Sequence, residues 1–140
     1  MTKEEDSIKP VFASRREIAA AYIFGSAASG RARPDSDIDI GVLVDPRALP
    51  QDPLKYRLRL MRDLGAALER FDVDIVLMNE APPALAQNIV AKGKLIFERS
   101  RATRIAFQIR TFNIFLDTEP MRRFHLQALK RRYFTRKSRG

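Results

Sequence analysis

The sequence contains no cysteine, no tryptophan and a single histidine, His125. Without thiols there are no disulfides or cysteine-ligated metal sites, and this absence is typical of a reducing compartment, so we expect a cytoplasmic protein. One histidine excludes a histidine metal cluster and argues against a Ser–His–Asp triad. No apolar run approaches the ~20 residues of a membrane span, and no signal peptide is recognisable, so the sequence predicts no membrane insertion.

Positive charge is unevenly distributed along the chain. Residues 1–100 carry 15 Lys and Arg against 15 Asp and Glu, whereas residues 101–140 carry 11 against 2, which accounts for the whole net charge of +9. We therefore expect a neutral domain over 1–100 and a basic helical extension over 101–140 packed on the same domain. The length allows one hydrophobic core and leaves no room for a separate substrate-binding domain.

Hydrophobic periodicity predicts a mixed α/β fold. The apolar run 18–24 has the composition of a buried strand, and strict alternation predicts two more strands over 37–44 and 71–78. Apolar residues at three- and four-residue steps predict an amphipathic helix over 54–70. Weaker patterns predict helices over 3–12 and 82–91, a short strand at 95–97, and a helix after Ser100 with one apolar face formed by Ile105, Ile109, Phe112 and Leu116.

Two aspartates flank Ile38 at the start of one predicted strand. Asp37 and Asp39 are two residues apart, so their side chains project from the same face. Like charges at 4 Å repel by ~1 kcal/mol in water and by several times more when partly buried, and Mg²⁺ relieves such repulsion with oxygen ligands. Asp74 becomes a third carboxylate if its strand is a neighbour. Three carboxylates around two metal ions suit in-line displacement at phosphorus.

The segment before these aspartates favours a phosphate site. Gly25 and Ser26 directly follow an apolar strand, where main-chain amides and a hydroxyl can approach phosphate oxygens without an intervening Cβ. Each feature alone has an ordinary explanation: a solvated strand face for Asp37 and Asp39, and a strand-ending turn for Gly25 and Ser26. Their combination, Gly-Ser followed by ten residues and Asp-Ile-Asp, favours a functional site.

This combination resembles the motif of the minimal nucleotidyltransferases of the polymerase-β-like superfamily. The resemblance covers about 18–97, with Val73-Asp74-Ile75-Val76 similar to the strand of the third carboxylate, and it extends to the aromatic stretch that ends in Pro120. It implies a nucleotidyltransferase fold: a small mixed β-sheet flanked by helices, with a C-terminal helical extension. The sequence departs from the family at Leu77, where relatives often carry a second acidic residue. Asp72 remains the alternative third carboxylate, because it shares the strand register of Asp74.

The resemblance also implies roles for these residues in transfer from ATP. Asp37 and Asp39 would ligate two Mg²⁺ ions, and Asp74 would complete the metal on the nucleophile's side and accept the hydroxyl proton. Gly25 and Ser26 would bind the nucleotide phosphates. Arg31 or Arg33 would neutralise phosphate charge, unless these arginines are ordinary surface residues.

Members of this family act as antitoxins that transfer AMP from ATP to a tyrosine of a HEPN-type toxin, an RNA-cleaving helical protein. The leading hypothesis is therefore an adenylylating antitoxin with a HEPN toxin as its partner. The alternatives are a non-catalytic antitoxin, an RNA-binding module, or an adenylyltransferase of a small-molecule hydroxyl. We expect the basic C-terminal segment to dock the protein partner rather than nucleic acid.

Overall fold

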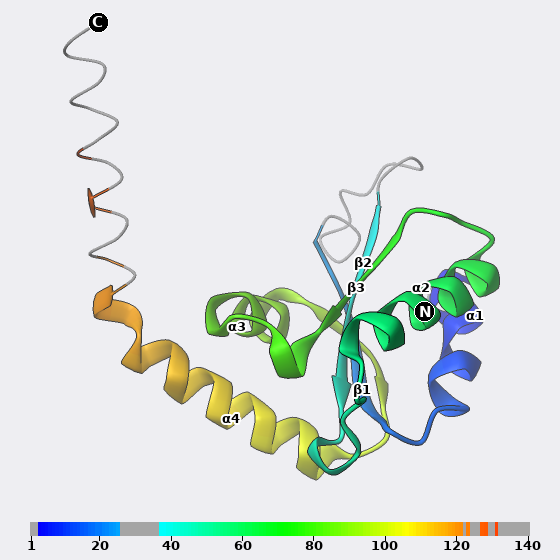
Figure 1. Cartoon of the computed structure of the whole chain (residues 1–140), viewed down its shortest axis with the longest axis horizontal. Helices are drawn as coiled ribbons and strands as arrows, with labels where there is room; N and C mark the ends of the chain where they lie inside the picture. Colours follow the sequence, from blue (N-terminus) through cyan, green and yellow to red (C-terminus); the bar gives the residue numbers. More distant parts are fainter. Residues whose placement is uncertain (1–2, 26–36, 122, 124–126, 129–130, 132–140) are drawn as a thin grey trace, which may run out of the picture.

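The structure, a computed structural model, places a four-stranded sheet between two layers of helices (Figure 1). It describes residues 3–25, 37–121, 123, 127–128 and 131. The elements in chain order are α1 (Lys3–Ala13), β1 (Ile18–Phe24), β2 (Ile38–Val44), the short 3-10 helix η2 (Pro46–Ala48), α2 (Pro53–Leu68), β3 (Val73–Leu77), the 3-10 helix η3 (Met78–Glu80), α3 (Pro83–Lys92), β4 (Lys94–Glu98) and α4 (Arg101–Asp117).

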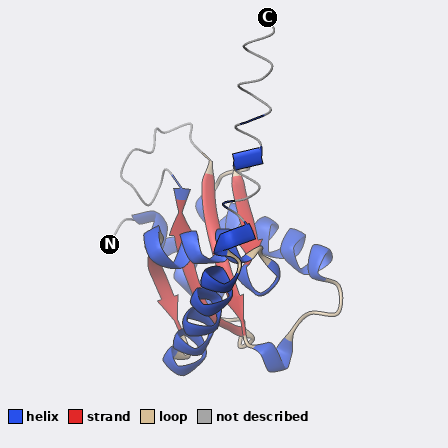
Figure 2. Ribbon diagram, turned by 90° about the vertical axis from the view of Figure 1, so that its left-hand side faces the viewer, coloured by secondary structure: helices blue, strands red, loops and turns tan. Residues whose placement is uncertain are grey.

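The sheet has the strand order β3-β2-β1-β4, and Figure 2 shows its strands in red. β1 runs antiparallel to both of its neighbours, β2 and β4, whereas β2 and β3 are parallel. A parallel pair needs a crossover connection, and α2 provides it. The crossover brings the beginnings of β2 and β3 to the same end of the sheet, where β1 ends.

Alternation along the strands divides their side chains between two cores. On one face Ile40 packs in a cluster with Phe12 of α1 and Leu60 of α2. On the other face Leu43 packs in a cluster with Ile89 of α3, and α4 contributes partly buried contacts there. Each strand face therefore buries its apolar residues under a different helix layer, and this fixes the strand register because a one-residue slip would place each set in the wrong core.

The end of β2 is held by a side chain from the neighbouring turn. The main-chain N–H of Val44 donates to Asn79 Oδ1 at 2.9 Å, and Asn79 Nδ2 donates to the Val44 carbonyl at 2.8 Å. β3 ends at Leu77, so the amide of Asn79 continues the hydrogen bonding where main-chain pairing stops. This contact fixes η3, and with it the start of α3, against the sheet.

The first turn of α2 is fixed by its cap. Asp52 Oδ1 accepts the N–H of Lys55 at 3.1 Å, and Pro53 occupies the first helical turn, where its missing N–H costs nothing. The cap fixes the position of the helix start, and with it Leu54 and Arg57, which lie beside β3.

The predicted mixed α/β fold is confirmed, and the predicted strands and helices are present with boundaries shifted by one or two residues. The apolar face of α4 lies outward. Thr111 is buried and Phe107 packs against the second core, whereas the exposed fractions of Ile109 and Phe112 are 58% and 47%. The division into a domain over 1–100 and an extension over 101–140 remains a prediction. Within the described ranges no helix is long and apolar enough to cross a membrane.

Candidate functional site

Asp39 lies at the point where three strands meet. Its Cα pairs with Phe24 near the end of β1 and with Asp74 near the start of β3. The strands are therefore neighbours, which was the condition for Asp74 to act as a third carboxylate. Asp37 immediately precedes β2 and is exposed.

Asp39 and Asp74 belong to the sheet face that α3 and α4 cover. Their chain neighbours Ile38, Ile40 and Ile75 are buried in the cluster on the opposite face. α3 covers this face as far as Gly41, where an added Cβ would lie 3.1 Å from Ile89 Cγ2. Asp39 is half-buried and Asp74 is exposed. The two carboxylates thus project from one face at the open end of the sheet.

The carboxylates raise the cost of ionising Asp39. Burial raises the pKa of the Asp39 carboxyl above its ordinary value, and the negative charges of Asp74 and then Asp37 raise it further. A cation placed among them would reverse this effect. In the part of the chain that the structure describes, no three His, Cys, Asp or Glu side chains gather closely enough to hold a metal ion. Mg²⁺ retains waters and substrate phosphates as ligands, so exposed carboxylates such as Asp37 and Asp74 are groups that it takes alongside a triphosphate.

Gly25 closes the site from the side of β1. Its φ is +72°, in the left-handed region that favours glycine, and a Cβ at this position would lie 2.5 Å from Asp39 Oδ2. The main chain can approach this carboxylate only because no side chain is present. Ser26 and Arg31, with Arg33, lie outside the described residues, so their predicted roles in phosphate binding remain predictions.

Asp74 is held by two contacts to the same oxygen. Oδ1 accepts the main-chain N–H of Ile75 at 3.0 Å, and Arg57 Nη2 lies 3.6 Å from it. Arg57 comes from α2 and reaches β3, the outermost strand of the sheet. No sequence signal indicated this arginine, because the contact depends on how a helix and a strand from separate segments pack.

Asp72, the alternative third carboxylate, is already engaged. Its Oδ1 accepts Arg70 Nε at 2.7 Å, and a second Arg70 nitrogen contacts Oδ2. The bonded guanidinium lowers the pKa of the Asp72 carboxyl. Arg70 also lies 3.7 Å from Glu4 Oε1. The geometry therefore favours Asp74, whose charge acts on Asp39, over Asp72.

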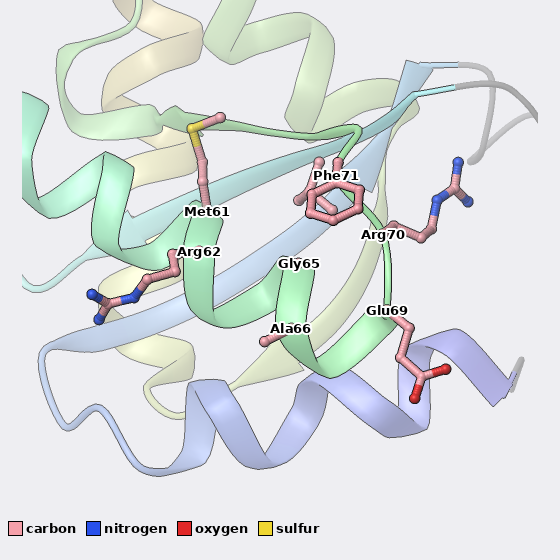
Figure 3. Close-up of a pocket in the computed structure, with 8 residues that line it drawn as sticks. Met61, Arg62, Gly65, Ala66, Glu69, Arg70 and Phe71 are labelled. Carbon is pink, nitrogen blue, oxygen red and sulfur yellow. The ribbon is translucent and has the colours of Figure 1, made fainter.

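A hollow of about 580 Å³ lies at the carboxyl-terminal end of α2. Figure 3 shows Met61, Gly65, Phe71 and other residues that line it, with Arg70 extending away. Its lining is mainly apolar and includes none of the three candidate aspartates. This hollow is therefore separate from the carboxylate site.

Comparison with known proteins agrees with this geometry. Residues 6–102 match the family described as polymerase beta, nucleotidyltransferase, and the chain belongs to this family. It is 33% identical over 107 residues to protein adenylyltransferase MntA of Shewanella oneidensis, an alignment that covers 76% of this chain and 67% of that protein.

Two solved structures are similar over most of the chain. One is a toxin–antitoxin with AMP-PNP, with a TM-score of 0.76, 27% identity and coverage of 90% of this chain and 98% of that chain. The other is a tri-AMPylated Shewanella oneidensis HEPN toxin in complex with an MNT antitoxin, with a TM-score of 0.71, 25% identity and coverage of 91% and 96%. The family expected from the sequence is thereby confirmed.

A first prediction concerns Gly25. In Gly25→Ala the new Cβ must displace the Asp39 carboxylate, and the left-handed φ adds roughly 1–2 kcal/mol of strain. We expect nucleotidyl transfer to fall by about tenfold or more while the protein stays folded. The test compares the rate of nucleotidyl transfer in Gly25→Ala, in Asp39→Asn and in the double variant with the rate of the wild-type protein. Because Gly25 acts through Asp39, the double variant should lose no more than Asp39→Asn alone, and independent, additive losses would contradict this.

Proposed function

We propose that this chain is an antitoxin that transfers AMP from ATP to a tyrosine hydroxyl of a HEPN-type, RNA-cleaving toxin and thereby neutralises it. The observation that carries the proposal is the register of Asp39 and Asp74 on adjacent strands, beside Gly25 and Asp37. A relative named as a protein adenylyltransferase supports the reaction type, and a related complex with AMP-PNP supports ATP as the donor. An AMPylated HEPN toxin in a similar complex supports the acceptor.

Asp37 and Asp39 would hold two Mg²⁺ ions together with the triphosphate, and Asp74 would complete the ligands on the acceptor's side. The residues fit such ions, because they are carboxylates crowded at an open site where burial and like charge raise the pKa of Asp39. When bound, Mg²⁺ neutralises phosphate charge and makes the α-phosphorus more open to attack.

The chain's own residues would bind the phosphates and move one proton. Gly25, with Ser26 and Arg31, would bind the phosphates at the end of β1. The acceptor oxygen forms a bond to the α-phosphorus, and the bond from this phosphorus to the oxygen of the β-phosphate breaks. Pyrophosphate leaves with the electron pair, and Asp74 accepts the hydroxyl proton. ATP and a cysteine-free sequence favour the cytoplasm as the location.

A second prediction tests the carboxylates. Asp37→Asn or Asp39→Asn should reduce AMP transfer by at least about 100-fold, because each removes a ligand of the metal-bound triphosphate. Asp74→Asn should retain ATP binding and lose turnover, since it acts on the attacking side. The measurement is transfer of labelled AMP from ATP to purified HEPN toxin, with ATP binding measured separately.

Asp6→Asn is the matched control for these variants, because Asp6 is exposed on α1, which packs on the sheet face opposite Asp39 and Asp74. Asp72→Asn should also leave transfer nearly unchanged. If Asp72→Asn loses turnover and Asp74→Asn does not, the third carboxylate is misassigned. Unimpaired transfer by Asp37→Asn and Asp39→Asn would reject the whole site, and absence of label transfer by the wild-type protein would favour a contact-only antitoxin.

The exposed face of α4 is the surface we assign to docking of the toxin. Ile105, Ile109, Phe112 and Leu116 form an apolar stripe on a helix whose other face packs on the domain. Arg101, Arg104 and Arg110 lie on the same helix, and further basic residues follow it in the sequence. An apolar centre with a charged rim is the composition of a protein interface, whereas an RNA surface would need no apolar stripe.

A third prediction tests this docking surface. Ile109→Glu should weaken toxin binding by about tenfold or more, because it places a charge in the apolar stripe, and it should leave ATP binding unchanged. Ala106→Glu, which adds the same charge at an exposed position of α4 outside the stripe, is the control. Binding is measured by titration calorimetry at two salt concentrations. Unchanged toxin affinity in Ile109→Glu, together with tight, strongly salt-dependent RNA binding, would identify the segment as a nucleic-acid surface instead.

A further inference from the structure

A groove of about 350 Å³ runs along the outer edge of β3. The first turn of α2 forms one wall with Leu54 and Arg57, and the start of α3 forms the other with Pro82 and Leu85. Asp74 lies in the groove. The anchoring of η3 through Asn79 and the cap of α2 at Asp52 therefore set the width of this groove from both sides.

We propose that this groove receives the acceptor, a tyrosine-bearing segment of the protein substrate, with the phenol oxygen beside Asp74. The proposal rests on the proposed function and names the place where that reaction takes its second substrate. Three observations carry it: the access to Asp74, the mixture of apolar and charged groups in the lining, and the position of Arg57.

Asp74 connects the groove to the site of transfer. Its Oδ1 is taken by the Ile75 N–H and faces Arg57, which leaves Oδ2 without a partner among the residues described. The carboxylate is thus oriented by one oxygen while the other can accept a proton. A hydroxyl in the groove reaches Asp74 from the outer edge of β3. Asp39 lies on the opposite side of Asp74, on β2, and Gly25 lies beyond it at the end of β1.

The lining combines apolar side chains with the charged Arg57, Asp74 and Glu80, and this mixture suits the ring and hydroxyl of a tyrosine. Leu54 is 62% exposed at the entrance, and Pro82 and Leu85 add apolar surface opposite it. A phenol ring packs on such surface and leaves its hydroxyl for the polar end. The volume lies within the range of pockets that enclose small ligands and side chains.

Arg57 supplies a positive charge where the acceptor oxygen becomes negative. Its Nε is buried and has no hydrogen-bond partner in the described part of the chain, and its Nη2 lies 3.6 Å from Asp74. A free phenol has a pKa of ~10, so at neutral pH its proton must be removed during attack. Arg57 acts as a positioning residue: its contact with Asp74 Oδ1 holds this carboxylate at the groove, where the phenol oxygen would form its bond to the α-phosphorus.

The absence of cysteine from the chain allows a direct test by disulfide trapping. Leu54→Cys places a single thiol in the groove, and Leu58→Cys places one on the same helix outside it. The two positions are similarly exposed, at 62% for Leu54 and 54% for Leu58. The partner is a HEPN toxin whose AMP-accepting tyrosine, identified by mass spectrometry with the wild-type protein, is replaced by Cys and whose other thiols are removed. A disulfide requires the two Cα atoms to lie within about 7 Å.

We expect Leu54→Cys to form the disulfide at least about tenfold faster than Leu58→Cys under the same oxidant. Equal rates, or trapping by Leu58→Cys alone, would overturn the proposal that the groove receives the acceptor tyrosine, while leaving the proposed function intact. A wild-type protein that modifies no tyrosine would overturn the proposed function itself, and the groove with it.

A kinetic comparison tests Arg57 independently of trapping. Arg57→Ala should lower kcat for the toxin by about tenfold or more and leave KM for ATP unchanged, with partial recovery in Arg57→Lys because the charge returns. Arg59→Ala, an exposed arginine on the same helix, is the control. If Arg57→Ala changes only thermal stability, or if Arg59→Ala loses as much kcat, the assignment of Arg57 is wrong.

Discussion

Repulsion among Asp37, Asp39 and Asp74 is the constraint around which this end of the protein is built. The parallel pairing of β2 and β3 places Asp39 and Asp74 directly opposite each other, and Asp37 lies two residues before Asp39, just before the start of β2. Both burial and the neighbouring charges raise the pKa of Asp39. Repulsion among these carboxylates lowers the stability of the folded protein, and a bound cation would remove this repulsion. The site is thus arranged for a metal-bound triphosphate before the ligand binds.

The surrounding elements make this crowding possible without closing the site. Gly25 lets the main chain approach Asp39, and Arg57 and the Ile75 N–H hold one oxygen of Asp74. α3 covers the sheet at Gly41, beyond which Asp39 is half-buried and Asp37 and Asp74 are exposed. The same helices that bury the core thereby define a phosphate side near β1 and an acceptor side at the edge of β3.

Much of this arrangement could be predicted from the sequence, and the limits have physical causes. Alternation in the sequence separates the two faces of β2 and β3, so Asp39 and Asp74 were correctly predicted to lie on the face opposite Ile40 and Ile75. Periodicity carries no information on strand order, so their adjacency depended on the family resemblance and was established by the pairing. The sequence gives no sign of the role of Arg57, because its contact with Asp74 arises only when α2 packs beside β3. The pattern in α4 identified one apolar face but could not indicate whether the domain covers it.

Thermal unfolding of the wild-type protein and Asp39→Asn, with and without ATP and Mg²⁺, tests the central claim most directly. A raised pKa means that protonated Asp39 stabilises the fold and that this stability is lost as the pH rises through the folded-state value. Asn imitates the protonated side chain, so at neutral pH and without ligands Asp39→Asn should unfold at a higher temperature than the wild type. With ATP and Mg²⁺ the order should reverse, because only the wild-type protein gains stability from the metal-bound nucleotide. An Asp39→Asn variant that is less stable without ligands, or that gains as much from ATP and Mg²⁺ as the wild type, would contradict the account.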